Sequence, residues 1–450
     1  FLLESGAAVG EMGSWHLLGA DPIGSAWVRG RRWRLRLAGV IEVGEGDPWG
    51  AVEAWWEAWR APPAPAAADL APGLPFTGGA VGYIGYEMGE HLERLGRRGT
   101  APHGMDAMPD LHLHLYDEVV AIERSSGRAF AVARGRSGRA GCRWWEREPR
   151  RCEEHVPRPI REISVSLDDG RYRRHVEEIR AMIARGDVYE VNLCRTHTLE
   201  GGPSPWALHR RLRRLQPVPY AALIPWRPVA VVSASPERFL RRRGPHVETR
   251  PIKGTAARGS DDEEDRHAAR ALLESEKERA ELAMIIDVER NDLGRVALPG
   301  SVRVVEEAAL EAYATVLHTV ATVAAEIPED LSPFAILRAT FPGGSITGAP
   351  KIAAMKTILA LEPTPRKAYT GSIGWISPQG DLDLSIAIRT ALFHEDRIHF
   401  SVGGAITWDS DPRRELAELE AKGRAIVAAL RGSGGAEGGK DSGSAHSRLP

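Results

Sequence analysis

Short apolar, β-branched runs alternate irregularly with amphipathic helical segments in the second half of the chain. Apolar side chains share one helical face over residues 169–185, where Asp168 can cap the first turn and Gly186 can end the last. Strand-like runs follow at 229–234 and 247–252. Because strands and helices do not repeat in a βαβ rhythm, the sequence predicts an α+β fold and not a doubly wound parallel sheet.

Five further segments carry helix or strand patterns. The sequence predicts a strand over 33–43 and a helix over 49–59. A long helix is expected over 262–286, and the alternation of residues 397–407 is typical of a strand. The pair Asp411-Pro412 has the order that favours a helix start, so a last helix should begin there.

Polar or proline-rich stretches divide the 450 residues of the chain. Residues 61–75 are rich in proline and alanine and are expected to form a linker or surface excursion within the first part. The composition predicts four parts: an N-terminal part (1–133), a linker loop (134–159), a C-terminal region with a denser pattern of helices and strands (160–431) and a disordered tail (432–450).

Charge and composition exclude several functional classes. The formal net charge is −2, with acidic and basic residues interleaved, so we expect no nucleic-acid partner and no anionic membrane surface. No apolar stretch approaches the roughly 20 residues that a membrane helix needs, and the first residues lack the form of a signal peptide. Three scattered cysteines make neither a disulfide framework nor a zinc site. The expected compartment is the reducing cytoplasm.

Two pairs of glutamates are spaced to share helix faces. Glu278 and Glu281 lie three apart on the predicted long helix, and Glu415 and Glu418 lie three apart on the last one. Lys422 follows one turn after Glu418. Two such faces, if opposed, would form an oxygen-rich cage suited to Mg²⁺. The same spacing also suits solvated glutamates in i,i+4 pairs, and spacing alone leaves both interpretations open.

Two ionisable side chains come at predicted strand ends. Lys253, between Ile252 and Gly254, could project into a cleft where desolvation lowers its pKa and makes it a nucleophile. Glu237 could be kept protonated by burial and serve as a general acid. The alternatives are a surface lysine at a strand end and a salt bridge between Glu237 and Arg238.

A glycine-rich element occupies residues 343–351. Gly343 and Gly348 have the spacing of a phosphate-binding P-loop, but the required Lys-Ser/Thr pair does not follow. Backbone amides and hydroxyls before a helix start at about Pro350 instead favour a carboxylate-binding turn.

Taken together, these segments resemble the chorismate-utilising enzymes, and the resemblance spans nearly the whole chain. This family is an α+β fold of two large antiparallel sheets packed as a sandwich, with helices outside and the active site in a cleft. The matching segments are Leu2–Ser5, Gly79–Tyr86, Gly186–Leu193, Ser235–Phe239, Arg250–Thr255, Met284–Gly294, Gly343–Lys351, Gly371–Trp375, Ile388–Thr390 and Glu415–Lys422.

The resemblance implies a metal site and a substrate pocket. Mg²⁺ would be held by Glu281 and Glu418 with Glu278 and Glu415 in support, and it would grip the ring carboxylate of chorismate. The residues implied near the substrate are Arg389, Gly403, Gly404, Lys422, Thr347 and His318.

Lys253 indicates the branch of the family. The Pro-Ile-Lys-Gly-Thr segment resembles the branch in which this lysine attacks ring carbon 2 and Glu237 protonates the departing 4-hydroxyl. Ammonia then yields 4-amino-4-deoxychorismate, a precursor of 4-aminobenzoate and folate. The alternative is the anthranilate-forming branch, which also eliminates pyruvate and usually has alanine at this position.

The resemblance also implies partners. Ammonia would come from a separate glutamine amidotransferase subunit, since no Gly-x-Cys-x-Gly nucleophile motif is present. The Leu-Leu-Glu-Ser segment, with Ser5, resembles the tryptophan site of the family, so bound tryptophan is a further expectation. Glu190 departs from the family pattern: aminating members often have glutamine there, and water-adding members have lysine. The absence of that lysine argues against the isochorismate- and salicylate-forming branches.

Overall fold

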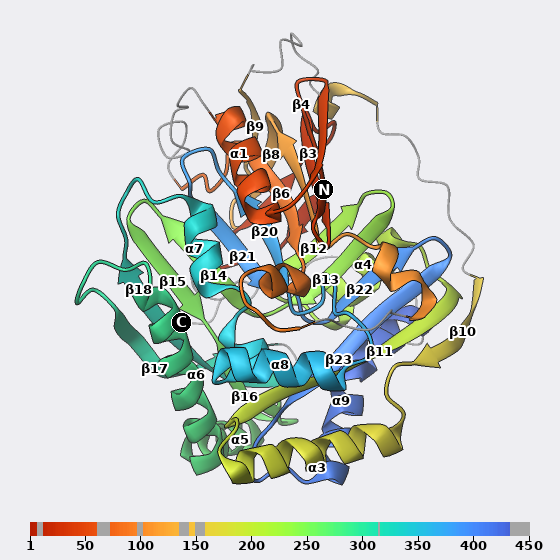
Figure 1. The fold of residues 1–450 in the computed structure, drawn as a ribbon, viewed down its shortest axis with the longest axis vertical. Coiled ribbons are helices and arrows are strands. Elements are labelled where there is room, and N and C mark those ends of the chain that lie inside the picture. Colours follow the sequence, from red (N-terminus) through yellow and green to blue (C-terminus); the bar gives the residue numbers. More distant parts are fainter. Residues whose placement is uncertain are drawn as a thin grey trace, which may run out of the picture.

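The computed structural model describes residues 1–6, 12–60, 73–96, 102–134, 144–148, 158–313 and 316–432. Two large sheets form the body of the molecule, and helices lie along their outer sides (Figure 1). Every strand pairing among the described residues is antiparallel. The predicted α+β class is therefore confirmed, and the sandwich of two antiparallel sheets with it.

The first sheet joins the two ends of the chain. Its described strands run in the order β10-β11-β23-β22-β13-β12-β1-β2-β8-β9, with β19 added beside β11. Their bounds are β10 Arg158–Val165, β11 Glu190–Gly202, β23 Arg397–Ile406, β22 Thr390–His394, β13 Val229–Ser235, β12 Tyr220–Pro225, β1 Leu2–Glu4, β2 Trp15–Leu18, β8 Glu118–Glu123, β9 Ala129–Ala133 and β19 Gly348–Ala349.

The second sheet is built in the same interleaved way. Its described order is β16-β18-β15-β14-β21-β20-β6-β7-β3-β4-β5, with β17 beside β18. The bounds are β16 Ile252–Ala257, β18 Val316–Glu326, β15 His246–Arg250, β14 Arg238–Arg243, β21 Leu382–Ile386, β20 Ser372–Ile376, β6 Gly79–Ile84, β7 Leu111–Tyr116, β3 Gly24–Arg29, β4 Arg32–Leu37, β5 Val40–Glu45 and β17 Arg303–Ala312.

The N-terminal part (1–133) and the C-terminal region (160–431) share both sheets. Strand β1 pairs with β12 in the first sheet, and β6 pairs with β20 in the second. One large buried cluster accordingly combines side chains from both parts, such as Trp56, Tyr86, Phe334 and Phe400. The predicted division at residue 133 is therefore not a division of the core.

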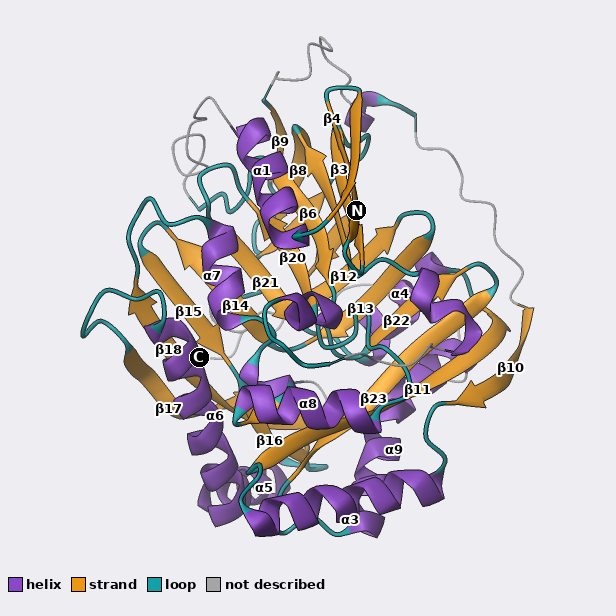
Figure 2. Ribbon diagram, viewed as in Figure 1, coloured by secondary structure: helices purple, strands orange, loops and turns teal. Residues whose placement is uncertain are grey.

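The helices are placed where they support the first and second sheets (Figure 2). Helix α9 packs on β23 and α3, α8 packs on β11, and α6 packs on β16 and β18. Their bounds are α1 Pro48–Arg60, α3 Asp169–Arg185, α4 Pro205–Leu215, α5 Asp262–Glu274, α6 Glu276–Gly294, α7 Pro333–Thr340, α8 Lys351–Leu361 and α9 Pro412–Arg431. No described helix is long and apolar enough to cross a bilayer.

Several local predictions are confirmed. Helix α3 begins after Asp168, whose side chain accepts a hydrogen bond from the backbone of Arg171, and ends at Gly186 in a left-handed conformation with φ of 80°. Helix α9 begins after Asp411, which caps it with Pro412 in the first position. Helix α1 and the strands β13 and β23 also lie where the patterns placed them.

Three predicted elements are wrong in extent because each contains a break. The strand expected over 33–43 is a hairpin of β4 and β5, since Ala38 adopts a φ of 49° in the turn. The helix expected over 262–286 is two helices, because the side chain of Ser275 caps a new start at α6. The run 247–252 is divided between β15 and β16 at Pro251, which has no N–H to donate.

Predictions for the loops lie largely outside the described residues. Residues 61–72 of the proline-rich stretch, most of the linker 134–159 and residues 433–450 of the tail belong to the undescribed part of the chain.

Candidate active site

Lys253 is buried and bound to one carboxylate. The residue lies on β16 and its Nζ donates to Oε1 of Glu190, at the start of β11, over 2.7 Å. The side chain of Lys253 is 9% exposed and that of Glu190 is 0% exposed. The second oxygen of Glu190, Oε2, is buried without a hydrogen-bond partner. The pair joins two sheets at positions 63 residues apart in the sequence.

The protonation of Lys253 differs from the sequence-based expectation. Burial lowers the pKa of Lys253, but the charge and hydrogen bond of Glu190, together with the charges of Glu281 and Glu237, more than offset it. The pKa therefore lies above its ordinary value. Desolvation acts in the expected direction, but the expectation of a lowered pKa is wrong, because an opposite charge within hydrogen-bond distance favours the ammonium form.

Glu237 has the character of a buried acid. It lies in the turn between β13 and β14, and its backbone oxygen accepts a hydrogen bond from Ile386. Its Oε1 accepts a hydrogen bond from Ser345 Oγ over 2.5 Å. Burial raises the pKa of Glu237 to about 7, against the opposing effects of Ser345 and Lys253. A carboxylic acid with this pKa holds a proton that it can donate near neutral pH.

The alternative for Glu237, a salt bridge with Arg238, is not formed. Arg238 is bound instead to Glu248, and its Nε lies 3.5 Å from Asp383 Oδ1 and 2.6 Å from the hydroxyl of Tyr220. The two neighbouring residues therefore serve different sites.

The glycine-rich element is held in place from α6. Oε1 of Glu289 accepts a hydrogen bond from the backbone of Gly344 over 2.9 Å. Lys351 is bound to Asp292 and also donates to the backbone oxygen of Pro342 over 2.6 Å. These contacts fix the turn that carries Ser345, and through it the hydrogen bond to Glu237. Thr347, fully buried, donates to the backbone oxygen of Gly343 within the same turn.

The four predicted metal ligands meet around one lysine. The ammonium of Lys277 interacts electrostatically with all of them, from α6 and from α9. Its Nζ lies 3.7 Å from Glu281 Oε1, and Lys422 Nζ lies 2.7 Å from Glu418 Oε1. Oε1 of Glu415 accepts a hydrogen bond from Ser410 over 2.7 Å. The acids of α6 and α9 therefore lie close enough to act on the same lysine. The acids in question are Glu278, Glu281, Glu415 and Glu418.

The donor chemistry of these acids suits a hard cation. Burial raises the pKa of Glu281 to about 7 and also raises that of Glu415. Burial disfavours the charge of Glu418 as well, yet Lys422 holds its pKa below the ordinary value. No three side chains of His, Cys, Asp or Glu in the described ranges lie close enough to hold a metal ion. Carboxylates are nevertheless the ligands that Mg²⁺ prefers. In the structure, the positive charges of Lys277 and Lys422 lie near these acids.

The remaining predicted substrate residues surround the same region. Arg389, at a φ of 52°, is close enough to influence the charge of Glu237 and of His318. Burial, with the charge of Arg389, lowers the pKa of His318 to about 4, so this imidazole is neutral. Its Nδ1 lies 2.9 Å from Thr255 Oγ1, and its buried Nε2 has no hydrogen-bond partner.

Gly403 and Gly404 lie on β23 opposite β11. A Cβ at Gly403 would lie 2.4 Å from Cys194 Sγ, so no larger residue fits without a shift. A Cβ at Gly404 would lie 3.7 Å from both Glu415 Oε2 and Lys422 Nζ. Gly403 therefore allows close packing against Cys194, and Gly404 places the backbone of β23 beside Glu415 and Lys422.

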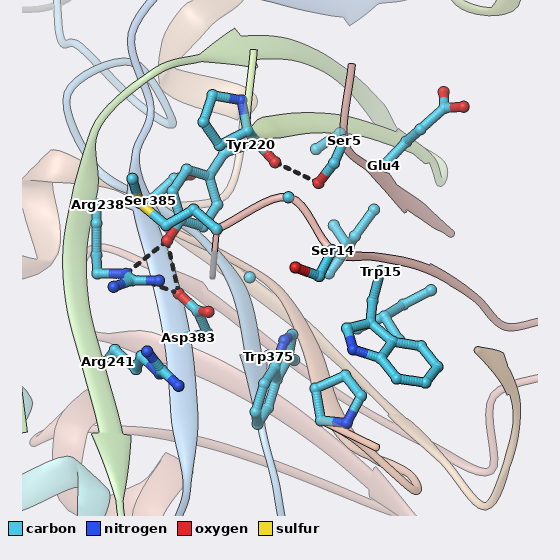
Figure 3. Close-up of a pocket in the computed structure, with 18 of the residues that line it drawn as sticks. Glu4, Ser5, Ser14, Trp15, Tyr220, Arg238, Arg241, Trp375, Asp383 and Ser385 are labelled. Carbon is cyan, nitrogen blue, oxygen red and sulfur yellow. Dashed lines mark hydrogen bonds and ion pairs between the residues drawn. The ribbon is translucent and has the colours of Figure 1, made fainter. Parts of the chain in front are cut away.

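A cavity of about 560 Å³ lies in another part of the molecule. It is lined by Ser5, Trp15, Tyr220, Arg238, Trp375 and Asp383, among others (Figure 3). Ser5 Oγ donates to the backbone oxygen of Pro219 over 2.7 Å. Ser5 is the one predicted site residue that lines this cavity.

Sequence reasoning missed three members of the reactive region. Lys277 had a local signal, since it precedes Glu281 by four residues on one helix face. Ser345 and Glu289 lay inside recognised segments, but their contacts with Glu237 and Gly344 join residues far apart in sequence. No spacing rule predicts such contacts.

Comparison with known proteins identifies similar sequences and folds. Residues 25–428 match the family described as chorismate binding enzyme. The chain is 36% identical to aminodeoxychorismate synthase component 1 of Salmonella typhimurium, over 93% of this chain and 90% of that protein. It is 38% identical to anthranilate synthase component 1 of Thermus thermophilus, over 79% of this chain and 78% of that protein.

A solved structure has the same architecture. Anthranilate synthase component I from Streptococcus pneumoniae superimposes with a TM-score of 0.78 at 26% sequence identity, covering 94% of this chain and 93% of that chain.

Proposed function

Because the chain belongs to the chorismate-binding enzyme family, we propose that it converts chorismate and ammonia to 4-amino-4-deoxychorismate, the precursor of 4-aminobenzoate and folate. Relatives named aminodeoxychorismate synthase component 1 support this activity at 36% and 32% identity over most of the chain. The observation that carries the proposal is the buried Lys253 near Glu237, whose pKa burial raises to about 7. A nucleophile and an acid at one site suit displacement of a poor leaving group.

The proposed reaction has two displacement steps. The neutral amine of Lys253 bonds to ring carbon 2, the two ring double bonds shift toward carbon 4, the bond between carbon 4 and its hydroxyl oxygen breaks, and Glu237 gives its proton so that water leaves. Ammonia then bonds to carbon 4, and the bond between carbon 2 and Lys253 breaks to release the lysine. The double bonds shift back in this second step. The product keeps the nitrogen at carbon 4 as an ammonium group, and a proton returns to Glu237 from solvent.

The binding of the substrate carboxylates is assigned to a cationic pocket. Arg389 and Lys422 supply positive charge, and the open backbone at Gly403 and Gly404 supplies N–H donors. Thr347 and the neutral His318 line the same region. Arg389 is partly buried, which strengthens its attraction for a carboxylate.

We assign the acids of α6 and α9 to Mg²⁺. Glu281 and Glu418 would hold the ion, with Glu278 and Glu415 in support. When bound, the ion supplies positive charge for the ring carboxylate of chorismate. The raised pKa of Glu281, which burial causes, supports the assignment because a cation relieves the cost of a buried carboxylate.

Ammonia is proposed to come from a glutamine amidotransferase. The designation component 1 of the relatives supports a second component. We also assign the cavity at Ser5 to tryptophan, since its aromatic walls and paired charges suit a zwitterionic aromatic amino acid.

Product analysis tests the proposal. Purified protein with chorismate, Mg²⁺ and ammonium is expected to form 4-amino-4-deoxychorismate, detected by mass spectrometry. Lys253→Ala should lower the rate on the order of 10³-fold or more, because a covalent nucleophile is removed. Lys356→Ala is the matched control, since this lysine is exposed on α8.

The anthranilate-forming reaction is the second candidate, supported by the Thermus thermophilus relative. Fluorescent anthranilate in place of the aminated product, with Lys253→Ala fully active, would establish it and refute the lysine mechanism.

A further inference from the structure

Glu190 stands apart from the other acids near Lys253 because it alone contacts the lysine. Its Oε1 lies 2.7 Å from Nζ, and among the described residues no other carboxylate oxygen lies within 4.0 Å of this nitrogen. The carboxylates that act on Lys253 from a longer distance are Glu281 on α6, Glu237 in the β13–β14 turn and Glu418 on α9.

The position of Glu190 is fixed by its backbone. Strand β11 pairs with β19, with Glu190 opposite Ala349. A Cβ at Gly348 would lie only 2.1 Å from the backbone oxygen of Glu190, so the glycine-rich element packs directly on this residue. The carboxylate is therefore held against Lys253 by two strands and not by a flexible loop.

The chemistry of Lys253 requires a proton acceptor. An ammonium group has no lone pair, so the lysine must lose a proton before it can attack carbon 2. Glu237 is unsuitable as acceptor because the same step needs it as a proton donor. Glu281 and Glu418 act on Lys253 through their charges but, unlike Glu190, make no ion pair with its Nζ among the described residues. Glu190 is enclosed, in hydrogen-bond contact, and has a free oxygen at Oε2.

We propose that Glu190 is the general base that removes the proton of Lys253, an inference that rests on the proposed function of this lysine. In the step, the ammonium of Lys253 and the carboxylate of Glu190 become a neutral amine and a carboxylic acid. Charge is conserved, since one positive and one negative group disappear together. After ammonia displaces the lysine from carbon 2, the proton returns from Glu190 and restores the pair.

Replacing Glu190 tests the proposal in the first half of the reaction. Stoichiometric enzyme is mixed with chorismate and Mg²⁺ without ammonia, and formation of the lysine adduct is followed by intact-protein mass spectrometry. Without ammonia, the pH-dependent conversion of ammonium to ammonia cannot affect the measured rate. In Glu190→Gln, Lys253 must lose its proton to solvent instead.

The decisive quantity is the ratio of the adduct formation rates of Glu190→Gln and the unmodified protein as pH rises. The effect of Glu237 cancels in this ratio. The ratio should be about 0.1 or lower near pH 7 and should rise about tenfold per pH unit until the lysine of the variant is neutral, because each unit changes the neutral fraction of an amine tenfold below its pKa. Glu200→Gln, an exposed change on the same strand, should keep a ratio near one.

Two other outcomes overturn the inference. A ratio that does not change with pH would show that Glu190 only supports the structure, and a variant faster near neutral pH would show that Glu190 restrains the lysine. If Glu190→Gln does not fold, Glu190→Asp decides: it keeps an acceptor and should show the pH profile of the unmodified protein. An adduct that forms in Lys253→Ala would refute the proposed function itself, whatever Glu190 does.

Discussion

The region around Lys253 and the cavity around Ser5 are both lined by charged side chains, but the two regions differ in how many of their buried polar atoms have hydrogen-bond partners. At the cavity, Glu4 lies 2.9 Å from His209 and 3.0 Å from Arg213, and Arg238 has Tyr220, Asp383 and Glu248 as partners. At Lys253, the buried atoms Glu190 Oε2, Glu289 Oε2 and His318 Nε2 have no hydrogen-bond partner.

This difference distinguishes the cavity around Ser5, as a binding site, from the region around Lys253, as a reactive site. None of the described side chains that line the cavity has a buried polar atom without a partner. Such atoms are costly, and a folded protein keeps few of them. The three atoms named above lower the free energy of unfolding, and incoming groups of a substrate can complete their contacts. The following changes test this contrast.

Glu237→Gln should have the largest effect. Glutamine has no proton to give to the leaving hydroxyl, so the turnover rate should fall about 10²- to 10³-fold. In the unmodified protein, the acid form is active, so the rate should fall as pH rises through about 7, the raised pKa of Glu237. Steady-state rates against pH check both points. A variant with ordinary activity would place the general acid elsewhere.

Glu281→Gln should lower the turnover rate about tenfold less than Glu237→Gln does. Loss of one ligand should weaken Mg²⁺ binding about 10- to 100-fold, measured by calorimetry on the protein alone. Exposed Glu276 on the same helix provides the matched control, as Glu276→Gln. Unchanged binding of Mg²⁺ in Glu281→Gln would exclude this site.

The same replacement should stabilise the metal-free protein at alkaline pH. Burial raises the pKa of Glu281 to about 7 from 4.5 in the ordinary state. A raised carboxyl pKa means that the folded state holds its proton more tightly, so this group's contribution to the free energy of unfolding decreases as pH rises from about 4.5 to about 7. Glutamine removes that penalty, on the order of 1 to 3 kcal/mol, and denaturant titration at pH 8 measures it.

Ser345→Ala should change the pH dependence of the turnover rate more than the maximal rate itself. The hydroxyl of Ser345 lowers the pKa of Glu237, which burial raises. Without the hydroxyl, the pKa of Glu237 should rise, and the alkaline fall in activity should move to higher pH by about one unit, while the maximal rate drops by less than about tenfold. A shift to lower pH would contradict the hydrogen bond as described.

Ser5→Ala should have the smallest effect on the reaction. It removes a buried hydrogen bond to Pro219, so the free energy of unfolding should fall by about 1 kcal/mol. The rate of amination should stay within about twofold, because the cavity does not include Lys253. Tryptophan binding, measured by calorimetry, should weaken. A large loss of amination would show that the two regions are not independent.

Features set by residues close together in sequence could be predicted, whereas contacts between residues far apart in sequence could not. Helix α3, with its cap at Asp168 and its end at Gly186, could be predicted because all its signals lie within one segment. The break before α6 also had a local signal, the capping sequence Ser275 to Glu278, but the continuous polar and apolar pattern concealed it. The contact of Lys253 with Glu190 joins different sheets, and only the assembled fold determines it.

The resemblance to a family predicted more of the site than spacing did. It named the acids of α6 and α9, all of which interact electrostatically with Lys277. It could not predict the protonation of Lys253, because that depends on Glu190, the position at which this chain departs from the family pattern.

The peptide bond between Glu237 and Arg238 links the two regions directly. Glu237 faces the reactive lysine, whereas Arg238 forms part of the cavity wall. The side chain of Glu237 is held by Ser345, one residue before the guanidinium that lines the cavity. A replacement of Arg238 that enlarges the cavity must therefore leave the orientation of the neighbouring acid intact to be tolerated.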